Sequence, residues 1–243
     1  MNPTHASTAG ARHRGPSLLA VGAVYTALFI ASLVGSTVMA GGEHFPSPFQ
    51  PELLSRDYFV EHAQAVRTGA FFQFAAAVPL GIFSATVASR VRFLGAELAG
   101  VSIALFGGFS ASLMLALSAL VQWVLSWSGV AAVPATVRAL HVLAFATGGP
   151  GYAVPFGLLV AGVSVTAGLQ GIAPRWLMWF GLVVAAAAEL TTLSLILPAA
   201  FYLLPAARFS GFVWMVCAGA LLPRARARST ERGSTEVRHE EHA

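Results

Sequence analysis

A single carboxylate interrupts the long apolar stretch of residues 176–197, and it is the first residue to consider for chemistry. Glu189 lies well inside this stretch, where an ionised side chain costs several kcal/mol unless it is paired, protonated or hydrated. Such a residue is by default a candidate for ligand binding or proton coupling. Thr192 follows three positions later, and on one face of a continuing helix its hydroxyl would donate a hydrogen bond to the carboxylate.

Arg138 and His141 offer a basic partner for Glu189. They are three positions apart, so their side chains share one face of a helix that begins near Pro134. His141 enters the apolar region from the same end as Glu189, and the long side chain of Arg138 reaches inward from nearer the surface. We therefore predict that Glu189 pairs with this basic face and that the pair closes a pocket.

Two glutamines add to the same polar region. Gln73 lies early in one apolar stretch and Gln122 lies late in the next, so antiparallel helices place both amides in the same half of the bilayer as Glu189. This distribution predicts a polar pocket between the second and fifth spans, open toward the outside. A buried hydrogen-bonded network that only fixes helix packing explains the same residues equally well, and both interpretations stay open.

The remaining metal-ligand side chains do not predict a metal site. Glu43, His44, Glu61 and His62 lie in a hydrophilic segment, and His141 lies elsewhere in the chain. Since no H-x-x-x-H or H-E-x-x-H spacing places two of them on one helical face, solvated loop residues are the favoured interpretation. We predict neither a metal nor another cofactor.

Other catalytic chemistries have little support. A serine hydrolase needs a nucleophile placed against His141 and Glu189, and the run Gly-Phe-Ser at 108–110 is only a fragment of the G-x-S-x-G motif. Cys217 is the only cysteine, which excludes an intramolecular disulfide and a zinc site built from paired cysteines. A membrane-embedded hydrolase is therefore the least favoured function, and no catalytic residue is assigned.

The composition is that of a protein inside a lipid bilayer. Of 243 residues, 56% are hydrophobic and 10% are charged, whereas soluble domains average about 25% charged residues. The mean hydropathy is +0.73, and long uncharged stretches separate short polar segments. All 14 basic residues are Arg, and they lie at the ends of apolar stretches rather than in an aromatic-interleaved patch, so nucleic acid is not an expected partner.

The apolar stretches predict an all-α bundle of about six transmembrane helices. A basic leader at 1–16 precedes the membrane domain at 17–222, and a disordered basic tail at 223–243 follows it. The outer loop at 41–67 contains a helix that Ser55 or Asp57 is expected to cap. The predicted spans are 17–40, 68–89, 98–127, a fourth that starts near 134 and continues through a break at 148–151 to 170, 176–197, and 210–222, the last being long enough only if it includes residues from 203 onward.

The end of the first span resembles a signal-peptide cleavage site. The stretch Val-Met-Ala at 38–40 precedes two glycines, as at a cleavage site, but the apolar region is longer than the roughly 7–15 residues usual in a signal peptide. A retained helix is therefore favoured over a cleaved one.

The arginines set the expected orientation. With both termini in the cytoplasm, ten of the fourteen lie on that side, as the positive-inside rule requires. The expected location is the cell membrane, and the basic tail is placed to touch anionic lipid headgroups at the cytoplasmic face. The ten residues are Arg12, Arg14, Arg90, Arg92, Arg175, Arg224, Arg226, Arg228, Arg232 and Arg238.

A short internal match relates two pairs of spans. When the chain is shifted by 76 residues, Ala-Val-Pro-Leu-Gly-Ile at 77–82 matches Ala-Val-Pro-Phe-Gly-Leu at 153–158. The match predicts a parallel repeat of hairpins, spans two and three repeated as four and five, with a proline kink at equal depth in each copy. Chance matches are common in helices rich in Ala, Gly and Val, and this alternative stays open.

Several helix ends carry a resemblance. They are Arg67-Thr-Gly-Ala-Phe, Ala-Phe-Ala-Thr-Gly-Gly-Pro-Gly at 144–151, Pro174-Arg-Trp, and Leu204-Pro-x-x-Arg208-Phe. In these segments the chain resembles uncharacterised small multi-pass bacterial membrane proteins, a family of unknown function. The resemblance implies an architecture of about six spans and supplies no catalytic or binding residue.

Three functional classes follow. The first is an accessory or structural membrane protein without a ligand, whose partners are the lipid bilayer and another membrane protein. The second is a secondary carrier or small-molecule binding protein, and the third is the hydrolase. Since the sequence contains no ATP-binding loop, transport would be secondary or passive. The pocket of the second class would be lined by Glu189, Arg138, His141, Gln73, Gln122 and Thr192.

Overall fold

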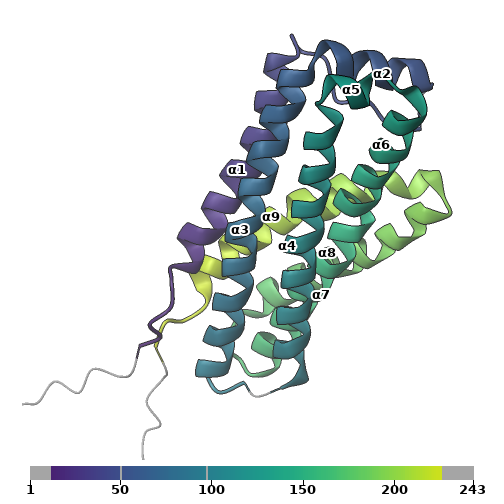
Figure 1. Ribbon diagram of the computed structural model, residues 1–243. Coiled ribbons are helices and arrows are strands. Elements are labelled where there is room, and N and C mark those ends of the chain that lie inside the picture. The colour runs from purple at the N-terminus through teal and green to yellow at the C-terminus, as the bar shows by residue number, and fades with distance from the viewer. Residues whose placement is uncertain (1–11, 50, 97, 226–243) are drawn as a thin grey trace, which may run out of the picture.

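The computed structural model describes residues 12–225 except residues 50 and 97, and every regular element in these ranges is a helix (Figure 1). The prediction of an all-α bundle is therefore confirmed, while most of the predicted leader and tail lies outside the described residues. The helices are α1 (Leu18–Met39), α2 (Glu52–Glu61), α3 (Ala63–Phe93), α4 (Ala99–Leu125), α5 (Ser128–Ala131), α6 (Pro134–Gly148), α7 (Pro150–Leu169), α8 (Arg175–Leu190) and α9 (Leu203–Leu221), with 3₁₀ segments η1 (Thr191–Leu195) and η2 (Pro198–Tyr202).

Six helical units among the described residues are long and apolar enough to cross a bilayer. The fourth, Pro134–Leu169, is 36 residues long and consists of α6 and α7, joined at the break that the sequence predicted. The sixth, Pro198–Leu221, contains α9, which begins at Leu203. The prediction that this span crosses the bilayer only if it includes residues from 203 onward therefore agrees with the structure.

The helix of the outer loop begins earlier than expected. α2 starts directly after Pro51, with no side-chain hydrogen bond at its N-terminus, so neither Ser55 nor Asp57 is its cap. The proline ring fixes the backbone at the point where the chain enters the helix, and this replaces a polar cap. Asp57 instead forms an exposed ion pair with Arg56 at 2.9 Å.

The spans close into a ring. Each packs against its neighbours in the order α1, α3, α4, α7, α8, α9 and back to α1. The centre is filled by large apolar side chains such as Phe83, Phe156 and Trp214, and α1 contributes Tyr25 and Phe29 to it. The first span is thus an integral wall of the bundle.

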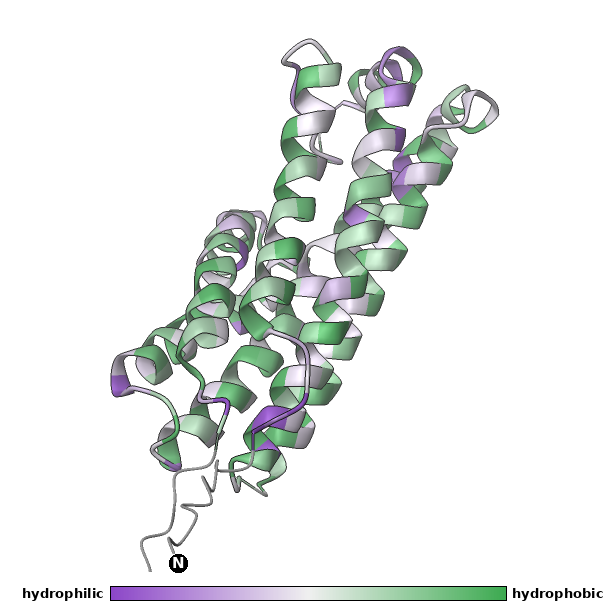
Figure 2. Cartoon of the chain, turned by 90° about the vertical axis from the view of Figure 1, so that its left-hand side faces the viewer, coloured by the Kyte–Doolittle hydropathy of each residue, from purple (hydrophilic) through white to green (hydrophobic). Residues whose placement is uncertain are grey.

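The outside of the bundle is apolar. Phe106 is 65% exposed, Leu113 64% and Val183 67%, each on a different part of the surface that faces away from the core. Most residues of the helices are hydrophobic, and many of the hydrophilic ones lie near the two ends (Figure 2). Such a surface is stable only where lipid tails cover it, so the described residues form a membrane protein.

Close helix approach depends on glycines at the centre of α4. A Cβ at Gly107 would lie 2.5 Å from the Pro155 carbonyl oxygen of α7, and a Cβ at Gly108 would lie 2.1 Å from Ser84 Oγ of α3. Both distances are shorter than any real contact, so α4 can touch its two neighbours only without side chains here.

The described ends of the chain meet at one end of the bundle (Figure 1). Arg12 and Ala225 form an isolated antiparallel bridge, and the His13 N–H donates to the Arg224 carbonyl at 2.8 Å. Arg90, near the end of α3, donates to the Pro16 carbonyl at 3.2 Å. The two ends of the chain therefore leave the bundle on the same side.

The two hairpins α3–α4 and α7–α8 cross at corresponding residues. A Cβ at Gly81 would lie 3.3 Å from Ser112 Oγ, and a Cβ at Gly157 would lie 2.9 Å from Ala188 Cβ. Both pairs obey the same shift, since 157 − 81 = 76 and 188 − 112 = 76. This geometry agrees with the predicted repeat, whose common origin stays a prediction.

The glycine contacts lead to a matched pair of variants. Gly107→Ala should lower the melting temperature of the detergent-purified protein by several degrees, because the new methyl group meets the backbone of α7. Gly35→Ala in α1 is the control, since its Cβ meets nothing within 4 Å and alanine favours a helix by up to about 1 kcal/mol. Equal effects of the two variants would show that α4 and α7 do not pack this closely.

Candidate functional site

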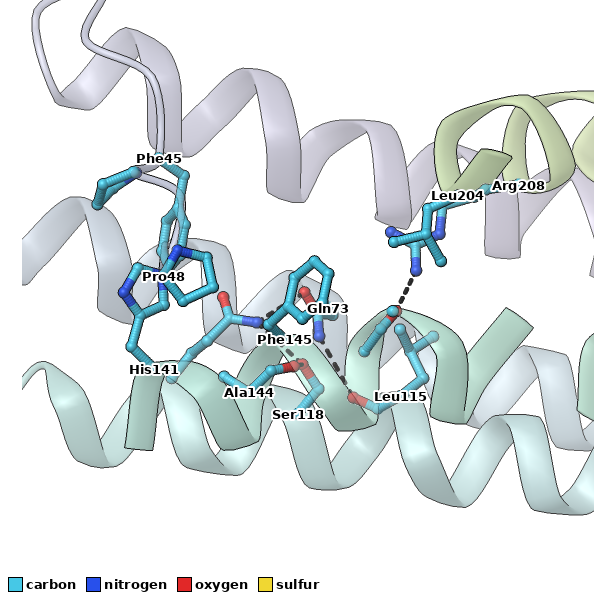
Figure 3. Close-up of a pocket in the computed structure, with 14 residues that line it drawn as sticks. Phe45, Pro48, Gln73, Leu115, Ser118, His141, Ala144, Phe145, Leu204 and Arg208 are labelled. Atoms are coloured by element: carbon cyan, nitrogen blue, oxygen red, sulfur yellow. Dashed lines mark hydrogen bonds between the residues drawn. The ribbon is translucent and has the colours of Figure 1, made fainter. Parts of the chain in front are cut away.

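A cavity of about 210 Å³ lies between α3, α4, α6 and α9, toward the end of the bundle opposite the described chain ends (Figure 3). The loop between α1 and α2 covers it with Phe45 and the prolines that follow. Of the six predicted site residues, the structure brings three together here, Gln73, Gln122 and His141. Arg208 also lines the cavity, although the sequence analysis did not single it out as a site residue.

The two glutamines form a network that joins three helices. Gln122 Nε2 donates to Gln73 Oε1 at 3.1 Å and to Ser118 Oγ at 3.2 Å. Gln73 Nε2 donates to the Leu115 carbonyl at 3.3 Å, and Ser118 Oγ donates to the Ala144 carbonyl of α6 at 2.9 Å. The two amides thus lie at one depth, as predicted, and they hold α3, α4 and α6 together while lining the cavity.

His141 closes the outer part of the cavity. Its ring is 2% exposed and packs edge-on against Phe45 and Phe59, with ring centroids at 5.5 and 5.1 Å. Nδ1 has no hydrogen-bond partner within the described ranges. The aromatic rings fix the imidazole, and one buried nitrogen is left available for a further hydrogen bond.

Arg208 is the charged group of the cavity. Its guanidinium carbon lies 4.7 Å from the ring centroid of Tyr152 and 4.9 Å from that of Phe29, and Nη2 donates to the Gly148 carbonyl. Nε is buried and makes no hydrogen bond to any described residue. The two rings attract the cation by about 0.5–2 kcal/mol each, so the side chain is held in place with one donor unused.

The position of Arg208 follows from the break between α6 and α7. α6 ends at Gly148, and Pro150 has no N–H with which to continue the helical ladder. The last carbonyls of α6 therefore lack their usual partners and carry the negative end of the helix dipole. Arg208 supplies a donor and a positive charge at this point.

The charge of Arg208 has no carboxylate partner in the part of the chain that the structure describes. The ion pairs found there join Arg56 to Asp57 at 2.9 Å and His62 to Glu43 at 3.2 Å, both in the outer segments. The cavity is consequently electropositive and offers two unused nitrogens, Arg208 Nε and His141 Nδ1. Chemically, this arrangement suits the binding of an anionic group.

The sequence contained a signal for Arg208. With the last span drawn at 210–222, the residue lies in an outer loop and needs no explanation. Once the span is extended back to 203, the same arginine lies inside it without an acidic neighbour, which marks a functional candidate.

Glu189 does not pair with Arg138 and His141, and this expectation is corrected. α8 packs on α7 and α9. Ala188 lies on its buried face, and the next residue, Glu189, lies on an exposed face. Its carboxylate lies against Gly157 of α7, where a Cβ would stand 3.0 Å from Oε1. Arg138 is likewise exposed, on the outer side of α6, and neither residue lines the cavity.

Thr192 also lies outside the cavity. The α-helix ends at Leu190 and continues as the 3₁₀ segment η1, in which residues three apart stay on one side, so Thr192 lies on the exposed side together with Glu189. Thr192 is exposed, whereas its neighbour Thr191 is buried and donates to the Ala188 carbonyl at 2.6 Å. Glu189 and Thr192 therefore share an exposed side of this span, and neither lines the cavity.

The outer segment pairs its charged groups locally. His62 Nε2 lies 3.2 Å from Glu43 Oε2, and among the described residues no three His, Cys, Asp or Glu side chains come close enough to hold a metal ion. Burial and the nearby Glu43 carboxylate both raise the pKa of Tyr58 above its usual value. These contacts stabilise the cover of the cavity.

The separation of Glu189 from Arg138 leads to a test by double-mutant cycle. Arg138→Ala and Glu189→Gln should change the melting temperature additively, because residues without shared partners do not couple. The measurement is thermal unfolding of the two single variants and the double variant in detergent. Rescue of Arg138→Ala by Glu189→Gln would show that the two charges meet after all.

The chain was compared with protein-family models, curated proteins and solved structures. No family model, curated protein or solved structure matches it. The assignment of a function therefore rests on the cavity and its residues.

Proposed function

We propose that this chain is a cell-membrane protein that binds a small anionic molecule beside Arg208, as a binding protein or a secondary carrier. The observation that carries the proposal is a half-buried guanidinium, with Nε fully buried, that lines a cavity and has no carboxylate partner among the described residues. An anion would accept from the free Nε and neutralise the charge. Gln73, Gln122 and His141 would hydrogen-bond the more distant end of the same molecule.

The depth of the site supports this proposal. Gly148, which accepts from Arg208, packs against Ser118 of α4, and Ser118 is five residues before Trp123 (123 − 118 = 5). At 1.5 Å per residue, the guanidinium lies roughly 8 Å below the level of Trp123, inside the apolar layer. A charge at this depth is costly unless it is paired, which favours an anionic ligand.

The arrangement of charges supports cytoplasmic termini. At the end where the described chain ends meet lie Arg12, Arg14, Arg90, Arg92, Arg175 and Arg224, and no Asp or Glu described by the structure lies among them. The acidic residues Glu43, Asp57 and Glu61 lie at the opposite end. Under the positive-inside rule the cavity then opens to the outside, and the basic end faces anionic headgroups of the inner leaflet.

A second candidate function is an accessory or structural protein that binds no small molecule and contacts another membrane protein. The hydrogen bond from Arg208 to the Gly148 carbonyl favours it, because this bond already gives the arginine a role in capping α6. The two candidates differ in one respect. Only the binding protein gains stability from an added anion.

The orientation leads to a prediction for reporter fusions. Fusions after residues 93 and 243 should give a fluorescent protein that folds in the cytoplasm, and fusions after residues 45 and 130 should give active alkaline phosphatase. The alternation follows from six spans with both termini inside. An external C-terminus would overturn the orientation and with it the outward opening of the cavity.

Binding is tested with benzoate and its neutral isostere benzamide, and with inorganic phosphate. We expect benzoate or phosphate, and not benzamide, to raise the melting temperature of the purified protein by a few degrees, because a ligand at 100 times its Kd adds about 2.7 kcal/mol. Arg208→Gln should abolish the increase, whereas the exposed Arg138→Gln should keep it. No increase with either anion, or an unchanged increase in Arg208→Gln, would leave the accessory function.

A further inference from the structure

A second cation lies where two surface grooves meet. Arg67, near the start of α3, lines an apolar groove on the outside of α3 and α4 and also a more polar groove beneath α2 and α5. Both grooves lie on the outer surface of the bundle, away from the cavity that contains Arg208. Arg67 is thus the one polar residue of the first groove and also lines the second.

The apolar groove has the shape and lining of a binding site for a hydrocarbon chain. Its volume is about 440 Å³, and apart from Arg67 it is lined by Ala70, Phe71, Phe74, Ala119, Leu120 and Trp123. Phe71 is 66% exposed and Leu120 47%, so these side chains border the groove without filling it. In a bilayer such a groove is occupied by acyl chains.

The second groove, of about 490 Å³, adds hydrogen-bonding groups on the other side of Arg67. Ser126, Ser128 and Arg56 line it together with the ring of Trp127. Arg56 is already paired with Asp57, so its charge is compensated. The arrangement provides room for a polar group next to Arg67.

Arg67 itself is positioned and still unpaired. Its Nε and Nη2 donate to Ser126 Oγ and to the Ser126 carbonyl, both at 3.3 Å, and its guanidinium carbon lies 5.6 Å from the Trp127 ring centroid. It takes part in neither of the ion pairs formed by the described residues. The guanidinium is therefore oriented by the protein and keeps its charge for an outside group.

The height of Arg67 in the bilayer matches that of a lipid phosphate. Arg67 and Arg90 are 23 residues apart on α3 (90 − 67 = 23), which is roughly 34 Å at helical rise, a little more than the hydrocarbon core. Trp123 and Trp127, which prefer the membrane interface, lie at the level of Arg67. The groove lined by Phe71 and Phe74 extends from there toward the membrane interior.

We propose that Arg67 binds the phosphate of a phospholipid in the leaflet opposite the chain termini, with one acyl chain in the apolar groove and the headgroup beneath α2. The occupant follows from charge complementarity, because one unpaired guanidinium at phosphate height joins an apolar groove to a polar one. Arginine binds phosphate oxygens through two parallel hydrogen bonds, which a lysine cannot reproduce.

The site is tested by native mass spectrometry of the full chain in detergent, titrated with dioleoylphosphatidylglycerol and with dioleoylglycerol, which has the same acyl chains and no phosphate. We expect one phospholipid per chain to bind at least about tenfold more tightly than the diacylglycerol. Arg67→Gln should remove this preference for the phospholipid, and Arg67→Lys should keep only part of it. Arg138→Gln, at an exposed arginine outside the groove, should leave the preference unchanged. Leu120→Trp, which fills the groove, should weaken both lipids.

Soluble glycerol 1-phosphate distinguishes the two sources of a phosphate group. It should fail to displace the phospholipid at millimolar concentration, since it lacks the acyl chain. Displacement by glycerol 1-phosphate would mean a site for a free phosphate ester and would overturn the lipid assignment. Equal affinity for the two lipids, or an unchanged preference in Arg67→Gln, would overturn the role of Arg67. None of these results depends on Arg208 or on anion binding in the cavity.

Discussion

A helix that ends inside the apolar layer must find partners for its last carbonyls, and this constraint organises the half of the bundle opposite the described chain ends. α6 ends at Gly148, where Pro150 interrupts the ladder, and no lipid can donate a hydrogen bond there. Arg208 supplies the donor from α9, and Phe29 and Tyr152 hold its guanidinium from α1 and α7. Side chains of α1, α7 and α9 thus converge on the end of α6, and the cavity lies beside this break.

Arg208 and Arg67, which both take part in neither ion pair of the described residues, suit different ligands because of where they lie. Arg208 is inside the ring of helices, where aromatic rings and a helix end compensate it only in part. Arg67 is at the surface, where its fixed guanidinium meets an apolar groove. The position of Arg208 inside the bundle suits a small anion that enters from water. The position of Arg67 at the surface suits a lipid of the surrounding bilayer.

The sequence was sufficient for the architecture because the bilayer imposes long uncharged stretches, and these identified six spans and the break in the fourth. It also placed Gln73, Gln122 and His141 at one depth, since antiparallel helices convert sequence position into depth. It could not decide which face of a helix points inward. The residues of α8 just before Glu189 are apolar on every side, so the sequence does not show that Glu189 and Thr192 lie on the exposed side of this span. A last span that begins at residue 210 places Arg208 in a loop, so the apolar pattern alone gives no reason to select this residue.

The proposed anion site requires a water-filled, electropositive cavity that reaches Arg208 from the side opposite the termini. It is tested most directly with Ser118→Cys in a Cys217→Ser background, because Ser118 lines the cavity and packs against Gly148, the acceptor of the Arg208 hydrogen bond. Intact cells are treated with two membrane-impermeant methanethiosulfonates, one bearing a sulfonate and the other a quaternary ammonium group. We expect labelling from outside, several-fold faster with the anionic reagent, and loss of this preference when Arg208→Gln is added. No labelling from outside, or equal rates for the two reagents, would contradict it.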